Sequence, residues 1–213
     1  LRLVCLSLQG DISGAGAVFQ RLSRFCPTTP NAEWWEALWQ FSEALIRAEK
    51  YAEAAAVLPL ALQVAVDDEK KVHGLVRLAD ACIRLNNVNQ AKDTLEEIRR
   101  SYPDSQELVQ VTTRLAQLQQ EMGNHLSAAE LYAELVAHPK VGPDLRFQAW
   151  ISRARSLVRA GQWQKAMEAF LAGEKAGANA TEQAQAVFEA AETAEGAKDI
   201  KQAAELYGRV ASQ

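Results

Sequence analysis

Residues 116–135 read AQLQQEMGNHLSAAELYAEL. The stretch contains two short segments with apolar residues at helical spacing, and Gly123-Asn124 is a turn signal between them. Each segment carries one small residue, Ala116 and Ala128, and Tyr132 follows one helical turn after the second. Small side chains at matching positions let the axes of two antiparallel helices come close together. The stretch therefore predicts a tightly packed pair of helices.

The same pattern recurs along the whole chain. An alanine marks the second segment of every copy, at steps of 39, 37, 37, 38 and 37 residues: Ala15, Ala54, Ala91, Ala128, Ala166 and Ala203. Another small residue lies twelve positions before each of the last five: Ser42, Ala79, Ala116, Ala154 and Ala191. A large apolar residue lies four positions after each alanine: Phe19, Leu58, Leu95, Tyr132, Phe170 and Tyr207. A period in the thirties with two helical segments is the signature of a helical solenoid.

These columns resemble the tetratricopeptide repeat. Three features besides the alanines carry the resemblance. Trp150 matches the family's first aromatic position, and the turn between the helices appears as Gly10-Asp11, Gly123-Asn124 and Gly161-Gln162. The closing proline appears as Pro27 and Pro103, and as Pro139 one residue early. The family's glycine position holds serine or alanine here, and the spacing exceeds the usual 34 residues by about three.

The resemblance covers residues 1–213 and implies an all-α fold, a right-handed superhelical α-solenoid of about six antiparallel helix pairs in a single domain. The first residues, from Leu1 to Leu6, are already helix-periodic and have no capping residue before them. We therefore expect the first pair to be truncated and the chain to be a fragment of a longer repeat protein.

Two helix starts can be predicted from local signals. Asn31 follows a proline and is expected to cap the aromatic helix that begins after it. Thr181 is expected to cap a helix over residues 182–195, which explains Asn179-Ala180-Thr181 better than a glycosylation site does.

The three cysteines, Cys5, Cys26 and Cys82, are scattered and lack CxxC spacing. Two antiparallel helices would hold Cys5 and Cys26 too far apart for a disulfide, which needs Cα atoms within about 7 Å. We interpret all three as packed thiols rather than as a metal or redox site.

Bulk properties exclude several classes of partner. The formal net charge of −4 gives no general attraction to nucleic acid or to anionic lipid. The apolar runs are too short to span a membrane. Apolar and charged fractions of 48% and 23% are those of a folded protein.

The sequence contains no residue set that is typical of catalysis, so we predict that the chain is not an enzyme and needs no cofactor or metal. His73, His125 and His138 lack metal-ligand spacing, and no phosphate-binding loop or nucleophile elbow is present. His125 occupies a column that is otherwise mainly apolar, which favours a packing role.

The resemblance implies that the first helix of each pair lines a concave groove that binds a peptide or protein partner. The side chains that it places in this groove are Trp39, Glu43, Val76, Arg84, Ile151, Arg155, Arg159 and Phe188. The main hypothesis is therefore a non-enzymatic protein–protein interaction scaffold. The alternative is a structural array that self-associates through its exposed terminal repeats or stacks with flanking repeats in a larger assembly.

One turn between repeats bears on the cellular location of the protein. Tyr102-Pro103-Asp104-Ser105 resembles the inter-repeat turn of many bacterial cell-envelope scaffolds. The resemblance suggests a bacterial protein of the cell envelope or periplasm, and a cytoplasmic location stays open as the alternative.

Overall fold

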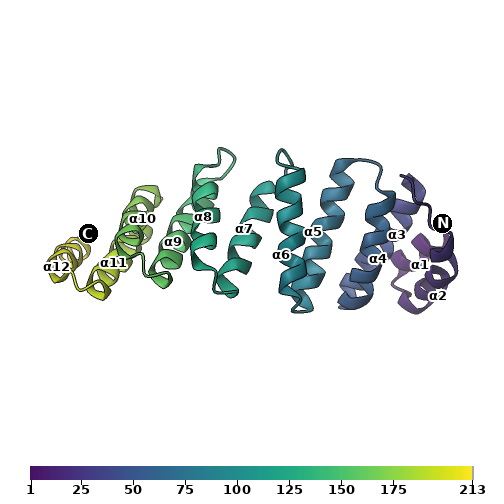
Figure 1. Ribbon diagram of the computed structural model, residues 1–213, viewed down its shortest axis with the longest axis horizontal. Coiled ribbons are helices and arrows are strands. Elements are labelled where there is room, and N and C mark those ends of the chain that lie inside the picture. The colour runs from purple at the N-terminus through teal and green to yellow at the C-terminus, as the bar shows by residue number, and fades with distance from the viewer. Residues whose placement is uncertain (213) are drawn as a thin grey trace. The chain divides into compact units, whose positions relative to one another are not determined.

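The structure is a computed structural model that describes residues 1–212. Helices are its only regular secondary structure over that range (Figure 1). They are α1 (Arg2–Gln9), α2 (Ile12–Leu22), the short 3₁₀ helix η1 (Ser23–Phe25), α3 (Ala32–Arg47), α4 (Tyr51–Val64), α5 (Asp68–Arg84), α6 (Val88–Ser101), α7 (Leu108–Glu121), α8 (His125–Ala137), α9 (Pro143–Arg159), α10 (Trp163–Ala176), α11 (Ala180–Gly196) and α12 (Ile200–Ala211). The prediction of an all-α chain built from helix pairs is confirmed.

A two- or three-residue turn joins the two helices of each pair. One residue in every turn has a left-handed backbone conformation, with φ between 57° and 79°: Gly10, Glu49, Asn86, Gly123, Gly161 and Lys198. The N–H of the next residue donates to the carbonyl five residues before it, as Asn124 does to Gln119 at 2.9 Å. This is the Schellman motif, which satisfies the last carbonyls of a helix and reverses the chain.

The predicted columns are the places where the helices pack most closely. All six column alanines are at most 4% exposed, and the five small residues twelve positions before them are fully buried. Among the large apolar residues of the third column, Leu58, Leu95, Tyr132 and Phe170 are also at most 4% exposed. Small residues on one helix and large ones a turn away therefore build the core of each repeat.

The helices form two compact units, Leu1–Val111 and residues 112–212. In the first unit, α4 packs against both α3 and α5, and Trp35, Leu38, Phe41 and Leu45 belong to its core. In the second unit, α10 packs against α9 and α11 around a core that includes Phe170. Helix α7 contributes its first four residues to one unit and the rest to the other. A single domain over residues 1–213 stays a prediction.

One of the two predicted helix caps is confirmed, and the other is wrong. The side-chain oxygen of Asn31 accepts the backbone N–H of Trp34 at 3.0 Å. Helix α11, however, begins two residues earlier than predicted, and Asn179, not Thr181, caps it by accepting the N–H of Glu182 at 3.0 Å. Asparagine caps at least as well as threonine, and Asn179 has the extended backbone that a capping residue needs.

The cysteines are all free, and one of them, Cys5, is less buried than predicted. Cys82 is buried and Cys26 is half-buried, and burial raises the pKa of both thiols. Cys5 is exposed on α1, so its interpretation as a packed thiol is wrong. No helix within residues 1–212 combines the length and the apolar character needed to cross a membrane.

Candidate functional site

The first helices of neighbouring repeats are connected by charged side chains. We call the surface on which α3, α5, α9 and α11 present these side chains the first-helix face, and we describe it separately in the two units. The ion pairs Glu43–Arg77 and Arg155–Glu189 link neighbouring first helices, and a hydrogen bond joins His73 of α5 to Glu107, the residue just before α7. Each of these contacts joins residues 34 positions apart.

In the first unit, an aromatic residue lies beside these charges. Trp39 is half-buried and stacks on Trp35, with ring centroids 5.3 Å apart and planes inclined by 17°. The centroid of the His73 ring lies 6.4 Å from that of Trp39, and His73 Nε2 is 2.9 Å from Glu107 Oε1. Stacking on Trp35 fixes the orientation of the half-buried Trp39 indole.

Arg77 holds the acidic side chains of this face. Its Nε is 2.8 Å from Glu43 Oε1, and its Nη1 is 3.8 Å from Asp80 Oδ2. The Glu43 side chain is only 21% exposed, and this arginine is the cation that lies beside it.

A pocket of about 390 Å³ opens next to His73, between the start of α5 and the loop that leads into α7. Its walls carry several acids together with apolar and aromatic groups: Asp68, Glu69, Val72, His73, Ser101, Tyr102, Pro103, Asp104, Ser105, Gln106 and Glu107. Within this pocket, the imidazole of His73 and the carboxylate of Glu107 are hydrogen-bonded to each other.

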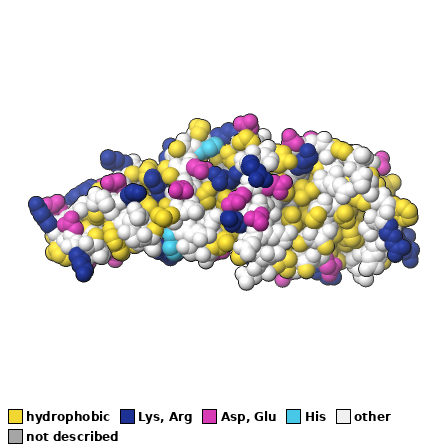
Figure 2. Space-filling view, in the orientation of Figure 1, with side chains coloured by type: hydrophobic (Ala, Val, Ile, Leu, Met, Phe, Trp, Pro, Cys, Tyr) yellow, Lys and Arg dark blue, Asp and Glu magenta, His cyan; other side chains and the backbone are white. Residues whose placement is uncertain are grey.

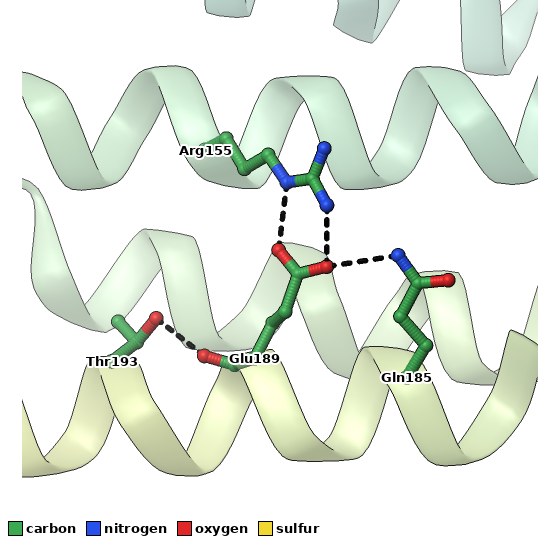
Figure 3. Close-up of polar contacts among 4 residues, drawn as sticks. All are labelled: Arg155, Gln185, Glu189 and Thr193. Carbon is green, nitrogen blue, oxygen red and sulfur yellow. Dashed lines mark hydrogen bonds and ion pairs between the residues drawn. The ribbon is translucent and has the colours of Figure 1, made fainter.

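In the second unit, Arg155 on α9 reaches across to Glu189 on α11 (Figure 3). The guanidinium donates two parallel hydrogen bonds, from Nε at 2.7 Å and from Nη2 at 2.6 Å. Gln185 donates a third hydrogen bond to the same carboxylate at 3.0 Å. The hydrogen bond with Glu189 raises the pKa of Arg155. This bidentate geometry fixes both side chains and pairs the charge of Arg155 with that of Glu189.

A second pocket, of about 250 Å³, lies beside this ion pair among α9, α10 and α11. It is lined by Arg155, Val158, Arg159, Trp163, Phe170, Glu189, Glu192 and Thr193. Trp163 is 38% exposed, whereas Phe170 is 2% exposed and forms part of the wall. The pocket therefore combines an accessible aromatic surface with charged groups.

The predicted groove residues differ in how much of each side chain a partner could reach. Val76 and Ile151 are 8% and 4% exposed and belong to the packed interior. Phe188 is 43% exposed and packs edge-on against Tyr207, with ring centroids 5.8 Å apart. Arg84 is exposed at the end of α5.

The structure brings some of these residues together. Arg155 and Arg159 line the same pocket in the second unit. Trp39 and Glu43 lie on α3, beside α5 residues of the first unit. A role for the eight residues in binding stays a prediction.

Sequence reasoning missed the residues that hold this face together. Arg77, Glu107, Glu189 and Trp163 were not predicted to line a site. Opposite charges 34 positions apart are visible in the sequence, but the repeat period of 37 to 39 residues directs attention to a different spacing.

Within the described part of the chain, no group of three or more histidine, cysteine or acidic side chains could hold a metal ion. His125 is half-buried at the start of α8, and its Nδ1 is buried without a hydrogen-bond partner.

Residues 45–115 match the profile of the tetratricopeptide repeat family. Solved structures of similar fold include MamA from Desulfovibrio magneticus RS-1, with 15% identity over 85% of this chain and 95% of that chain and a TM-score of 0.62. BtubC from P. vanneervenii is 11% identical over 99% of this chain and 89% of that chain, with a TM-score of 0.61. YrrB, a tetratricopeptide repeat protein with an unusual peptide-binding site, is 17% identical over 82% of this chain and 83% of that chain, with a TM-score of 0.58. At these identities the likeness establishes the fold alone, and no curated protein sequence matches the chain.

Proposed function

Because residues 45–115 belong to the tetratricopeptide repeat family and the remaining helix pairs have the same fold, we propose that the chain is a protein–protein interaction scaffold that binds a peptide or protein segment on its first-helix face. The fold supports protein binding in general, and we propose the first-helix face as the surface that binds.

The observation that carries this choice is the pairing of charges between neighbouring first helices. Arg77 and Arg155 each engage a carboxylate on the adjacent repeat, which orders the face without filling it. Aromatic side chains stay partly accessible beside these pairs, Trp39 in the first unit and Phe188 in the second. Aromatic anchors that are held rigidly before binding lose little entropy when a partner covers them, and they dominate many interfaces.

The proposal assigns no catalysis to the chain, in keeping with the non-catalytic scaffolds that are typical of this family. A bacterial envelope or periplasmic location stays a prediction.

The self-associating array remains the second candidate, and a different surface favours it. Helix α4 carries the apolar residues Ala52, Ala56 and Pro59 at exposed positions, together with the polar residues Glu53 and Gln63. Figure 2 shows apolar side chains gathered over α4, whereas acidic and basic side chains gather over α6. Phe25 is also 75% exposed in the same unit. Exposed apolar side chains that gather on one surface can mark an interaction site, so a second copy would pack there.

The experiment that tests the proposal begins with crosslinking and pull-down of the full chain to identify partners. The affinity of each purified partner is then measured by calorimetry for Trp39→Ala and Phe188→Ala. Truncation of an anchor is expected to cost about 2 kcal/mol or more, which is roughly a thirtyfold loss of affinity.

The control is Lys165→Ala, which removes an exposed charge from α10, a second helix. It should leave the affinity unchanged. Binding that Lys165→Ala weakens and that both aromatic variants leave intact would contradict the proposal. Binding that is abolished only by Ala52→Glu, together with concentration-dependent dimerisation in sedimentation experiments, would favour the array.

A further inference from the structure

The constant offset of the ion pairs identifies an arginine that has no counterpart on the next repeat. In the second unit, Arg155 on α9 lies opposite Glu189 on α11, 34 residues later. One helical turn further along α9, the same offset places Arg159 opposite Thr193. Thr193 carries no charge, is 5% exposed, and donates its hydroxyl hydrogen to the backbone carbonyl of Glu189 at 2.7 Å. The sequence thus supplies a carboxylate for Arg155 and none for Arg159.

Arg159 is exposed in the last turn of α9. Within residues 1–212, it forms no ion pair with any carboxylate. The carbonyl end of the helix favours a cation there, but this effect is small and screened by salt. A guanidinium with five donors and no bound acceptor can still receive a carboxylate in a planar, two-pronged geometry.

The surroundings of Arg159 favour a partner that carries an apolar side chain next to its acid. Arg159 shares the 250 Å³ pocket with Trp163, Val158 and Phe170, so an acid bound at the guanidinium lies in the same pocket as an indole that is 38% exposed. Gly196 of α11 lies against the Trp163 ring, since a Cβ atom there would come within 3.3 Å of it. The indole is therefore packed against α11 and still partly exposed. A pocket of this size accommodates one large side chain and its neighbour, and it is too small for a folded domain.

We propose that the pocket among α9, α10 and α11 binds an internal aspartate or glutamate of a partner segment, with an adjacent large apolar side chain packed on Trp163. The inference rests on the proposed scaffold function and specifies the partner's chemistry at one position. Arg159, and not Arg155, donates to the partner's acid, because Arg155 already donates two hydrogen bonds to Glu189. Glu192 lines the same pocket, and its carboxylate opposes an incoming negative charge.

The test uses the full ¹⁵N-labelled chain and two blocked peptides, acetyl-Phe-Asp-Phe-amide and acetyl-Phe-Asn-Phe-amide. The blocked ends remove terminal charges, so the two peptides differ only in the central carboxylate. We expect the aspartate peptide to shift the Trp163 indole N–H resonance and to bind about tenfold more tightly than the asparagine peptide, the gain typical of a charged hydrogen-bonded pair.

Two variants should move this preference in opposite directions. Arg159→Gln should abolish the difference between the peptides, whereas Glu192→Gln should tighten binding of the aspartate peptide severalfold. The matched control is Arg100→Gln, an exposed arginine in the last turn of the second helix α6, which should leave the Trp163 shift and the preference unchanged.

Equal affinity for the two peptides, or a preference that survives Arg159→Gln, would overturn the inference. An unshifted Trp163 resonance would also overturn it. If Trp163 is unshifted while the purified natural partner shifts the indole of Trp39, the pocket assignment fails and the scaffold proposal stands. If that partner shifts no residue of the first-helix face in either unit, both fail.

Discussion

Replacement of Ala54 by leucine tests whether the alanine column is a true contact point between helices. Ala54 is 0% exposed on α4, and Ser42 on the facing helix α3 is also 0% exposed. The substitution adds three carbon atoms where the core has no free surface. Overpacking of this kind typically costs about 1–3 kcal/mol, so the free energy of unfolding should fall by that amount. For a chain of about 200 residues, this corresponds to a melting temperature lower by about 2–12 °C.

The matched control is Ala56→Leu, two residues further along the same helix. Ala56 is exposed, and alanine and leucine have similar helix propensities, so its effect should stay within about 0.5 kcal/mol. Thermal and urea unfolding should be followed by circular dichroism and by tryptophan fluorescence. If the two compact units unfold separately, only the transition of residues 1–111 should move. Equal melting temperatures for the two variants would refute the assignment of the column as a helix–helix contact.

Two further predictions concern helix starts. Asn179→Ala should lower the free energy of unfolding by about 1 kcal/mol because it removes the cap of α11, whereas Thr181→Ala should have little effect. Chemical denaturation of both variants checks this prediction. A larger loss of stability in Thr181→Ala than in Asn179→Ala would contradict the assigned cap. The side chain and the backbone N–H of Lys70 hold the pKa of the Asp67 carboxyl below its ordinary value, so its stabilising contribution is full above that ordinary value and is lost as the pH falls through the lower folded pKa. Carboxyl resonances followed by NMR should show a higher Asp67 pKa in Lys70→Ala, and an unchanged value would rule out this cause.

Features that lie within one repeat could be predicted from the sequence alone. The alanine column, the small residues twelve positions before it and the period of 37 to 39 residues follow from contacts between two consecutive helices. Such contacts repeat at fixed spacing because both helices belong to the same short segment. Gly10, Gly123 and Gly161 marked three of the six turns for the same reason, since glycine readily adopts a left-handed conformation.

Features that depend on how one element is placed against another needed the tertiary structure. Glu49 and Lys198 adopt the left-handed conformation without being glycine, because the packed helix pairs on either side determine where the chain must reverse. The burial of Val76 and Ile151 likewise depends on neighbouring helices that their own helical pattern does not reveal.

The candidate site belongs to this second class. Its ion pairs join residues 34 apart, about one helical turn less than the repeat period, because adjacent first helices do not meet at equivalent positions. The sequence alone determined that Arg155 and Arg159 lie one turn apart on the same helix. The placement of α11 against α9 decided that Arg155 meets a carboxylate and that Arg159 lies opposite a threonine, because contacts between repeats are set by helix placement and not by periodicity.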